Sequence, residues 1–326
     1  MQLLPYLMKL DKIDLKILHQ LDLNARIPDT KLAKKAGRSR EAVRYRINQL
    51  KEKKVIRGFS TIINPSALGY QAYSMFAAVG GKTKDRDEFY EFIKKQKNLF
   101  WFEISEGGWD INMVFFAKTH HEFLQEQREI TAKYRHFILR KNISIVESVH
   151  FFPKKYLSSN KDTFKRLFFG VSNLKVDEKD FSILQAISHN GRAKLIEIAQ
   201  ETKLSVDIVR GRMKKMEQSG IIQGYTVDID YNVINLELFK VLIHFKNPSD
   251  AQERRFLQFC QDSDLVISHV RTSAPWDAEI NVVVSNFKEF NIFIRDVKDQ
   301  FSDMIIDTDA SSVSESYFFP NKNFEL

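Results

Sequence analysis

The stretch RSREAVRYRINQLKEKK, residues 38–54, decides how the chain is interpreted. It carries four arginines and three lysines in seventeen positions. Its apolar residues Val43, Ile47 and Leu50 recur at the spacing of one buried helix face. Ser39 precedes them as a good N-cap. The stretch therefore predicts a short amphipathic helix with a strongly positive exposed surface.

The exposed surface of this helix divides into two basic flanks and a polar centre. Such flanks suit the phosphate walls of a DNA major groove, and the central side chains can reach base edges. A merely solvated charged helix is the alternative. The residues predicted to contact DNA here are Arg38, Ser39, Arg40, Glu41, Arg44, Tyr45, Arg46, Asn48 and Lys51.

The positive charge of the chain is concentrated around this helix. The net charge is +8, and residues 9–57 hold fifteen Lys/Arg against six Asp/Glu. Residues 175–224 hold nine against seven, and the rest of the chain is net negative. A concentrated basic patch is typical of a protein that binds a polyanion, so double-stranded DNA is the expected partner.

Composition excludes several other classes of protein. The single cysteine, Cys260, permits no internal disulfide and no thiolate metal site. No catalytic constellation, metal cluster or cofactor motif stands out, so neither a metal nor a cofactor is expected. The longest apolar runs have the length of strands, and the N-terminus makes a poor signal peptide. We expect a cytoplasmic protein with no membrane partner.

The sequence contains two copies of one unit. A shift of 166 residues aligns residues 38–53 with LSVDIVRGRMKKMEQS, residues 204–219. A shift of 167 pairs Trp109-Asp110 with Trp276-Asp277. This register indicates a tandem duplication. Identical pairs include Asp11/Asp177, Asp14/Asp180, Asn24/Asn190, Arg26/Arg192, Arg44/Arg210 and Arg46/Arg212.

Each unit predicts three short helices and a β wing with a turn at Gly58, followed by strand and helix signals in the order βαββαβ. The predicted fold class is α+β, with two tandem copies of a winged helix-turn-helix followed by a ferredoxin-like domain. The connector is expected to hold a short helix around residues 163–169. The predicted boundaries are 9–65 and 175–232 for the helix-turn-helix domains, 66–153 and 233–320 for the α/β domains, and 154–174 for the connector.

These motifs together resemble the Lrp/AsnC (feast/famine) transcriptional regulators. The segments LAKKAG, SREAVRYRINQL, VIRGF and INPSALGY carry the resemblance in the first copy. The family implies a winged helix-turn-helix that binds DNA and an α/β domain that senses a small molecule, such as an amino acid, and assembles the oligomer. We expect self-association through the α/β domains: the two domains of one chain pair, and the chain then dimerises. The alternative is that each domain pairs with its equivalent in a second chain.

The resemblance also points to the turns that would hold an effector. Packing of the two tryptophans at an interface is the alternative. The second copy has Ala274-Pro275 at its turn, which stiffens it. The effector-binding candidates are Gly107, Gly108, Trp109 and Asp110 in the first turn, and Trp276 and Asp277 in the second.

The second recognition helix carries fewer DNA-binding candidates, namely Arg210, Arg212 and Lys214. Gly211 stands where the first copy has Tyr45, and glycine costs a helix interior about 1 kcal/mol relative to alanine. We expect this helix-turn-helix to be degenerate and to bind DNA more weakly.

A rival interpretation comes from siroheme decarboxylases, which the chain also resembles because they share this two-part fold. That resemblance implies basic side chains along the sheet that hold an anionic tetrapyrrole, and His269 and Arg271 lie in a suitable strand. The first copy has no basic residue in WFEISEGGWD. Because the recognition helix has kept its positive charge, we expect a regulator and not an enzyme.

Overall fold

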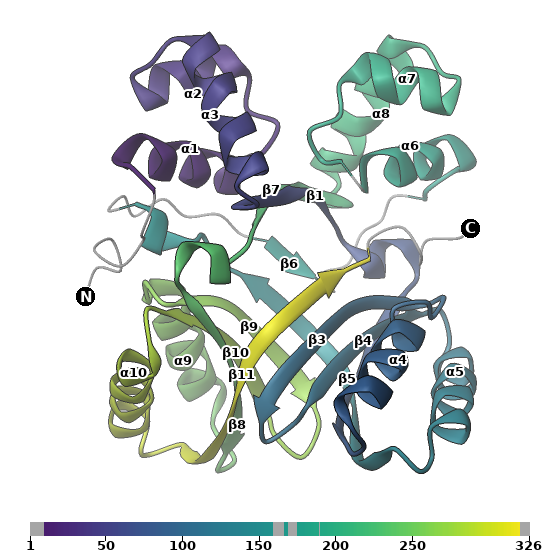
Figure 1. The fold of residues 1–326 in the computed structure, drawn as a ribbon. Coiled ribbons are helices and arrows are strands. Elements are labelled where there is room, and N and C mark those ends of the chain that lie inside the picture. The colour runs from purple at the N-terminus through teal and green to yellow at the C-terminus, as the bar shows by residue number, and fades with distance from the viewer. Residues whose placement is uncertain (1–9, 159–165, 169–174, 189, 320–326) are drawn as a thin grey trace.

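The computed structural model describes residues 10–158, 166–168, 175–188 and 190–319. Two helical heads lie side by side above a β structure (Figure 1). The first head contains α1 (Lys12–Leu23), α2 (Asp29–Ala36) and α3 (Arg40–Glu52); the second contains α6 (Glu178–Ser188), α7 (Leu195–Thr202) and α8 (Val206–Gln218).

Capping residues fix where the helices of the first head begin and end. The Asp11 carboxylate accepts hydrogen bonds from the backbone N–H of Ile13 and Asp14, at 2.8 and 2.9 Å, and starts α1. The Ser39 hydroxyl starts α3 in the same way. Gly37 ends α2 in the left-handed conformation, with φ 67°. The N-cap role that the sequence predicts for Ser39 is confirmed.

The two heads are joined by a two-stranded antiparallel ribbon of β1 (Ile56–Ile63) and β7 (Ile222–Ile229). The turn predicted at Gly58 is therefore wrong, and the wing strand of each head pairs with the wing strand of the other head. Residues 56–63 form one strand with a bulge between Ile56 and Gly58, and the partner strand comes from the other half of the chain. Apolar patterning identifies a strand but does not identify its partner.

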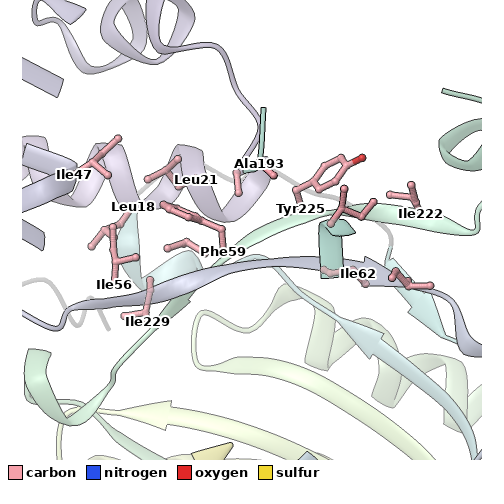
Figure 2. Packing of buried hydrophobic residues seen from close by; sticks show 14 of the residues in the cluster. Leu18, Leu21, Ile47, Ile56, Phe59, Ile62, Ala193, Ile222, Tyr225 and Ile229 are labelled. Carbon is pink, nitrogen blue, oxygen red and sulfur yellow. The ribbon is translucent and has the colours of Figure 1, made fainter. Parts of the chain in front are cut away.

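The ribbon interlocks the heads, because α1 packs against β7 and α6 packs against β1. Figure 2 shows Phe59 of the ribbon beside Leu18 and Leu21 of α1. The backbone N–H of Ala25 donates to Tyr225 O at 3.0 Å, and the equivalent Gly191 N–H donates to Phe59 O at 2.8 Å. The heads are thus held in a fixed relation by both packing and hydrogen bonds.

Below the ribbon, each half contributes four strands and two helices in the predicted order βαββαβ. The first half supplies β2 (Gln71–Val79), α4 (Thr83–Ile93), β3 (Leu99–Gly107), β4 (Ile111–Ala117), α5 (His120–Lys133) and β5 (Ile138–Phe151). The second half supplies β8 (Glu237–Phe245), α9 (Asp250–Asp262), β9 (Val266–Ser273), β10 (Ala278–Val284), α10 (Phe287–Gln300) and β11 (Ile305–Phe318). The prediction of the fold class is confirmed.

The eight strands close into a barrel. Their order is β2-β4-β3-β11-β8-β10-β9-β5, and β5 pairs again with β2. Two of these pairings, β3 with β11 and β9 with β5, join unlike halves, so the expected pairing within one chain is confirmed. The four helices cover the outside of the barrel (Figure 1). Its interior is therefore a space shared by both halves.

The connector contains β6 (Arg166–Phe168), which pairs with the last residues of β5. The helix expected around residues 163–169 is therefore wrong at residues 166–168, where the backbone pairs with a neighbouring strand instead. Residues 163–165 and 169 lie outside the described part of the chain.

Candidate nucleic-acid interface and the barrel cavity

The recognition helix α3 presents an exposed surface of mixed basic and polar side chains. Tyr45 is 66% exposed at its centre. Arg40 and Lys51 lie on one flank and Asn48 near the centre, and all three are exposed. Val43, Ile47 and Leu50 are buried, as their spacing predicts. Of the other candidates, Arg38, Ser39 and Glu41 are also exposed.

Arg46 is held by an ion pair within its own head. Its guanidinium donates to Asp11 Oδ2 at 2.6 Å and to Asp14 Oδ1 at 2.8 Å, at the start of α1. In the second head Arg212 makes the equivalent contacts with Asp177 and Asp180. This ion pair ties the recognition helix to the first helix in both heads. Sequence reasoning placed Arg46 on the phosphate flank and missed this partnership.

Arg44 is linked to the opposite head through a shared carboxylate. Its Nε lies 2.5 Å from Asp29 Oδ2, and Arg192 of the second half lies 2.5 Å from Asp29 Oδ1. The two arginines and their hydrogen bonds outweigh the effect of burial and lower the pKa of Asp29. Because the Arg44 side chain remains 58% exposed, it is still accessible to a ligand.

The second recognition helix has a different surface. Arg210 pairs with Asp207 at 2.5 Å, and Gly211 and Lys214 are exposed. Ile208 is an apolar side chain that is 43% exposed on this helix. Val206 and Glu217 occupy the positions of Arg40 and Lys51 in the first copy. The surface that α8 presents therefore carries less positive charge than that of α3.

The two carboxylates expected to hold an effector bind backbone within their own domains. Asp110 Oδ2 accepts from the N–H of Val79 at 2.8 Å, and Asp277 Oδ2 accepts from the N–H of Phe245 at 2.7 Å. Each carboxylate thus fixes a hairpin to the end of the neighbouring strand.

The other effector candidates lie at the end of the barrel away from the ribbon (Figure 1). The rings of Trp109 and Trp276 are 6.1 Å apart, and Trp276 packs edge-on against Phe76 at 4.9 Å. Gly107 has φ 131° and Gly108 follows it in the turn, where Arg140 donates to the Gly108 carbonyl. The two tryptophans thus meet within one chain, between its two halves.

A cavity of 250 Å³ lies between this aromatic cluster and the ribbon. Its walls are mostly apolar and include stacked rings, such as Phe100 and Phe116 at 4.0 Å. A wall of this kind around a few polar groups is typical of small-molecule sites. The cavity is therefore a candidate site for a small molecule.

The floor of the cavity is a buried charged network. Lys240 Nζ lies 3.2 Å from Glu103 Oε2 and 3.6 Å from Glu279 Oε2. Asn112 donates to Glu103 at 3.3 Å, and the Trp276 indole N–H donates to Glu279 at 3.1 Å. Sequence reasoning missed these residues, although a charge inside the strand-like runs FWFEIS, FKVLIH and AEINVVV was a usable signal.

Burial and charge act against each other in this network. Burial lowers the pKa of Lys240, but Glu103 and Glu279 outweigh burial, so the pKa is raised and the lysine is an ammonium ion. Burial raises the pKa of Glu279 and Lys240 offsets only part of that effect. Two carboxylates therefore share one cation in a water-poor site.

The ribbon end of the cavity is lined by Arg57, Lys154 and Arg166, all with carboxylate or carbonyl partners. Lys154 pairs with the buried Asp22, whose pKa is lowered because Lys154 and Arg166 outweigh burial. Arg57 lies 2.9 Å from Asp228. Burial lowers the pKa of Arg166 to about 10, and its guanidinium donates to the backbone carbonyls of α1 and β7.

The two residues considered for tetrapyrrole binding point away from the cavity. His269 packs against the Phe256 ring of α9, and burial lowers its pKa to about 3. Arg271 pairs with Glu253 and Glu147 on the outer side of the barrel. The neighbouring Ser268 and Val270 line the cavity instead. Strand alternation explains this difference, because successive side chains point to opposite faces.

Within the described residues, no helix is long and apolar enough to cross a membrane. Over the same ranges, no three histidine, cysteine, aspartate or glutamate side chains are placed to hold a metal ion.

The sequence is similar to known regulators in both heads. Residues 10–51 match the AsnC-type helix-turn-helix domain, and residues 176–223 match a winged helix-turn-helix DNA-binding domain. The transcriptional regulator LrpA of Pyrococcus horikoshii is 36% identical over 112 residues, which are 33% of this chain and 77% of LrpA. The regulator Ptr1 of Methanocaldococcus jannaschii is 42% identical over 121 residues, 37% of this chain and 80% of Ptr1.

The two heads place the chain in the class of proteins with helix-turn-helix DNA-binding domains. The extent of the match with LrpA and Ptr1 makes the assignment more specific. The chain belongs to the Lrp/AsnC family of transcriptional regulators.

Over its full length the chain is also similar in fold to an enzyme. The crystal structure of the siroheme decarboxylase NirDL superposes with a TM-score of 0.63 at 10% identity, covering 97% of this chain and 95% of NirDL. The NirDL complex with an iron-uroporphyrin III analogue gives a TM-score of 0.61 at 11% identity, covering 94% and 92%. At these identities the likeness establishes the fold alone.

The prediction that the chain is not an enzyme is contradicted by this finding. Two solved structures that share its whole-chain architecture are those of a decarboxylase. The retained charge on α3 did not justify the exclusion, because one fold supports both DNA binding and catalysis.

Proposed function

We propose that the protein is a sequence-specific transcriptional regulator that contacts DNA mainly through its first head. The observation that carries this proposal is the exposed surface of α3, where Arg40 and Lys51 lie on one flank and Tyr45 lies at the centre. Arginine and lysine on such a flank neutralise phosphates, and a central tyrosine is placed to contact base edges. The equivalent positions Val206 and Glu217 cannot neutralise phosphate.

Both heads lie on the side of the ribbon away from the barrel (Figure 1), which suits a single duplex laid across them. The second head then adds weaker phosphate contacts through Lys214 and its neighbour Lys215, both exposed. In this proposal Arg46 and Arg212 each stabilise their own head and do not contact phosphate, because their guanidinium groups are already paired with aspartates of that head.

The test is an electrophoretic mobility shift against the upstream region of the protein's own gene, repeated over a range of salt concentrations. Each neutralised phosphate contributes about −0.9 to the slope of log affinity against log salt. Replacing Arg40 and Lys51 by alanine should flatten the slope by about two and weaken binding strongly. The matched control, Lys214→Ala with Lys215→Ala, should have a smaller effect.

Equal losses from the two double variants would contradict the asymmetry of the heads. An affinity that does not depend on salt would remove the DNA-binding proposal. Tyr45→Ala should leave the slope unchanged and reduce the preference for the upstream region over random DNA. If it weakened binding to both DNAs equally, the base-reading role of Tyr45 would be lost.

A small molecule, such as an amino acid, modulates DNA binding in this proposal, and the protein acts in the cytoplasm. The chain further self-associates through the outer surfaces of its α/β domains. Adding an amino-acid panel to the mobility-shift assay tests the first point. Light scattering at micromolar concentration tests the second, and a strict monomer would refute it.

The whole-chain likeness to NirDL favours a second candidate function, decarboxylation of an anionic tetrapyrrole. The ribbon end of the cavity is lined by Arg57, Lys154 and Arg166, which would be the basic groups nearest such a ligand. Titration with iron-uroporphyrin, followed by absorbance in the Soret region, tests this candidate. A saturable shift that Arg57→Ala weakens would support it, and the absence of any shift would refute it.

A further inference from the structure

The cavity floor carries more hydrogen-bond acceptors than it satisfies. Glu103 lines the cavity and is only 1% exposed, yet its Oε1 has no hydrogen-bond partner. Asn281 also lines the cavity; its amide nitrogen donates to Ser268 at 2.9 Å, and its Oδ1 has no partner. An unsatisfied buried acceptor destabilises the folded protein, so it marks a place where a donor binds favourably.

The charge of the floor has the sign that suits a cationic donor. Two carboxylates, Glu103 and Glu279, contact a single ammonium group, that of Lys240. The basic residues at the ribbon end have carboxylate or carbonyl partners of their own: Arg57 pairs with Asp228, Lys154 with Asp22, and Arg166 donates to the Asp22 carbonyl. A second ammonium group at the floor would complete the charge balance and supply the missing hydrogen bonds.

The walls define the rest of the ligand. Between the floor and the ribbon the cavity is bounded by the rings of Phe100, Trp101, Phe116 and Phe318, together with aliphatic side chains such as Val270. Its volume of 250 Å³ lies just below the range of about 300–1,000 Å³ usual for small-molecule sites. This space suits a compact apolar body, such as one aromatic ring.

We propose that the barrel cavity binds a small organic monoamine, with its ammonium group at Glu103 and Asn281 and its apolar body among the aromatic walls. A free amino acid is a poorer ligand, because its carboxylate is one carbon from the ammonium and would face Glu103 and Glu279. Both halves of the chain line the site, so its occupancy acts on the pairing of the halves beneath the DNA-binding heads. The proposal rests on the proposed function only for this effect on DNA binding.

The test uses the full-length protein and three compounds that share a phenylethyl body: 2-phenylethylamine, phenylalanine and 3-phenylpropionate. Isothermal titration calorimetry measures their affinities, and tryptophan fluorescence follows the same titrations because Trp276 contacts Glu279. The amine should bind at least about tenfold more tightly than either carboxylate-bearing compound. Equal binding of all three, or no binding of the amine, would overturn the proposal.

Variants separate the charge of the site from its volume. Glu103→Gln should weaken amine binding by about tenfold or more, and Glu106→Gln, on an exposed position of the same strand, should not. Val270→Phe keeps the charged floor and fills the cavity, so it should also abolish binding and decides the matter if Glu103→Gln fails to fold. Unchanged affinity in either cavity variant would overturn the proposal.

The same samples separate this proposal from the proposed function. Amine binding that disappears in the cavity variants, in a protein that shows no affinity for DNA, supports the ligand site and refutes the DNA-binding proposal. Intact DNA binding without amine binding refutes the ligand site alone. An amine that binds but leaves DNA affinity unchanged supports the site and refutes its action on the heads.

Discussion

Replacing Lys240 with methionine should destabilise the barrel strongly at neutral pH. The lysine is the cation shared by Glu103 and Glu279, at 3.2 and 3.6 Å, and all three side chains are at least nine-tenths buried. Removing one partner from a buried ion pair costs about 3–5 kcal/mol, because an uncompensated charge remains. Methionine fills similar volume, so most of the loss is electrostatic.

The loss should depend on pH in a defined direction. Burial already raises the pKa of Glu279, and without Lys240 nothing offsets it. A carboxyl group whose folded-state pKa lies above its unfolded value stabilises the protein while it is protonated, and that contribution is lost as pH rises. The difference between wild type and variant should therefore be smaller near about pH 5 than near about pH 8.

Urea denaturation followed by tryptophan fluorescence measures this effect, because Trp101, Trp109 and Trp276 all lie on the barrel. The matched control is Lys298→Met, which removes an exposed pair with Asp307 and should cost about 0–1 kcal/mol.

Adding Glu103→Gln and Glu279→Gln to the Lys240 variant should restore most of the lost stability, since neutral amides leave no unpaired charge. The reasoning would be refuted if Lys240→Met cost no more than Lys298→Met, or if its cost were the same at both pH values.

Three further predictions concern other parts of the molecule. Arg46→Ala should destabilise the first head by about 1 kcal/mol and lower its melting temperature, because Arg46 pairs with Asp11 and Asp14. It should leave the salt slope of DNA binding unchanged, and a slope flattened by about one would show that Arg46 contacts phosphate instead. Lys203→Gly should stabilise the second head by about 1 kcal/mol in thermal denaturation, because Lys203 adopts the left-handed conformation, with φ 55°, at the position where the first copy has Gly37. No gain in stability would show that the lysine backbone is unstrained. The imidazole of His269 should not titrate between about pH 5 and pH 8 when followed by NMR, since burial lowers its pKa to about 3. Because the unfolded histidine takes up its proton near its usual pKa of 6.5, the stability of the protein should fall as pH drops below that value. A titration midpoint near neutrality would contradict the burial of His269.

The heads were predictable because their signals are local. Ser39 caps α3 and Gly37 ends α2, and both act on backbone within a few residues of themselves. The role of Arg46 was harder to see, because its partners lie on another helix. The duplication nevertheless contained a signal: Asp11, Asp14 and Arg46 are all identical in the second copy, as an ion pair that holds each head together requires.

The ribbon and the cavity depend on contacts that strand patterns do not encode. The apolar run at residues 56–63 predicted a strand, but its partner in the other half follows only from the assembled topology. The tryptophans of the two turns were assigned from a resemblance, and the structure brings them together inside the barrel. The charges of Glu103 and Lys240 inside apolar strands marked both residues as unusual, but only barrel closure, which places them 3.2 Å apart, identifies them as partners.

The contact between Glu103 and Lys240 crosses from one half of the chain to the other and has no mirror image. The positions related to them by the duplication are Val270 and Ser74, which carry no charge. In a dimer of identical subunits every surface patch must complement itself, so a mutation appears on both sides at once. Covalent fusion removes that restriction. Each half was then free to diverge from the other, so the two halves of the scaffold are no longer equivalent. A protein of this kind can lie on DNA in a preferred orientation and so distinguish the two directions of a promoter.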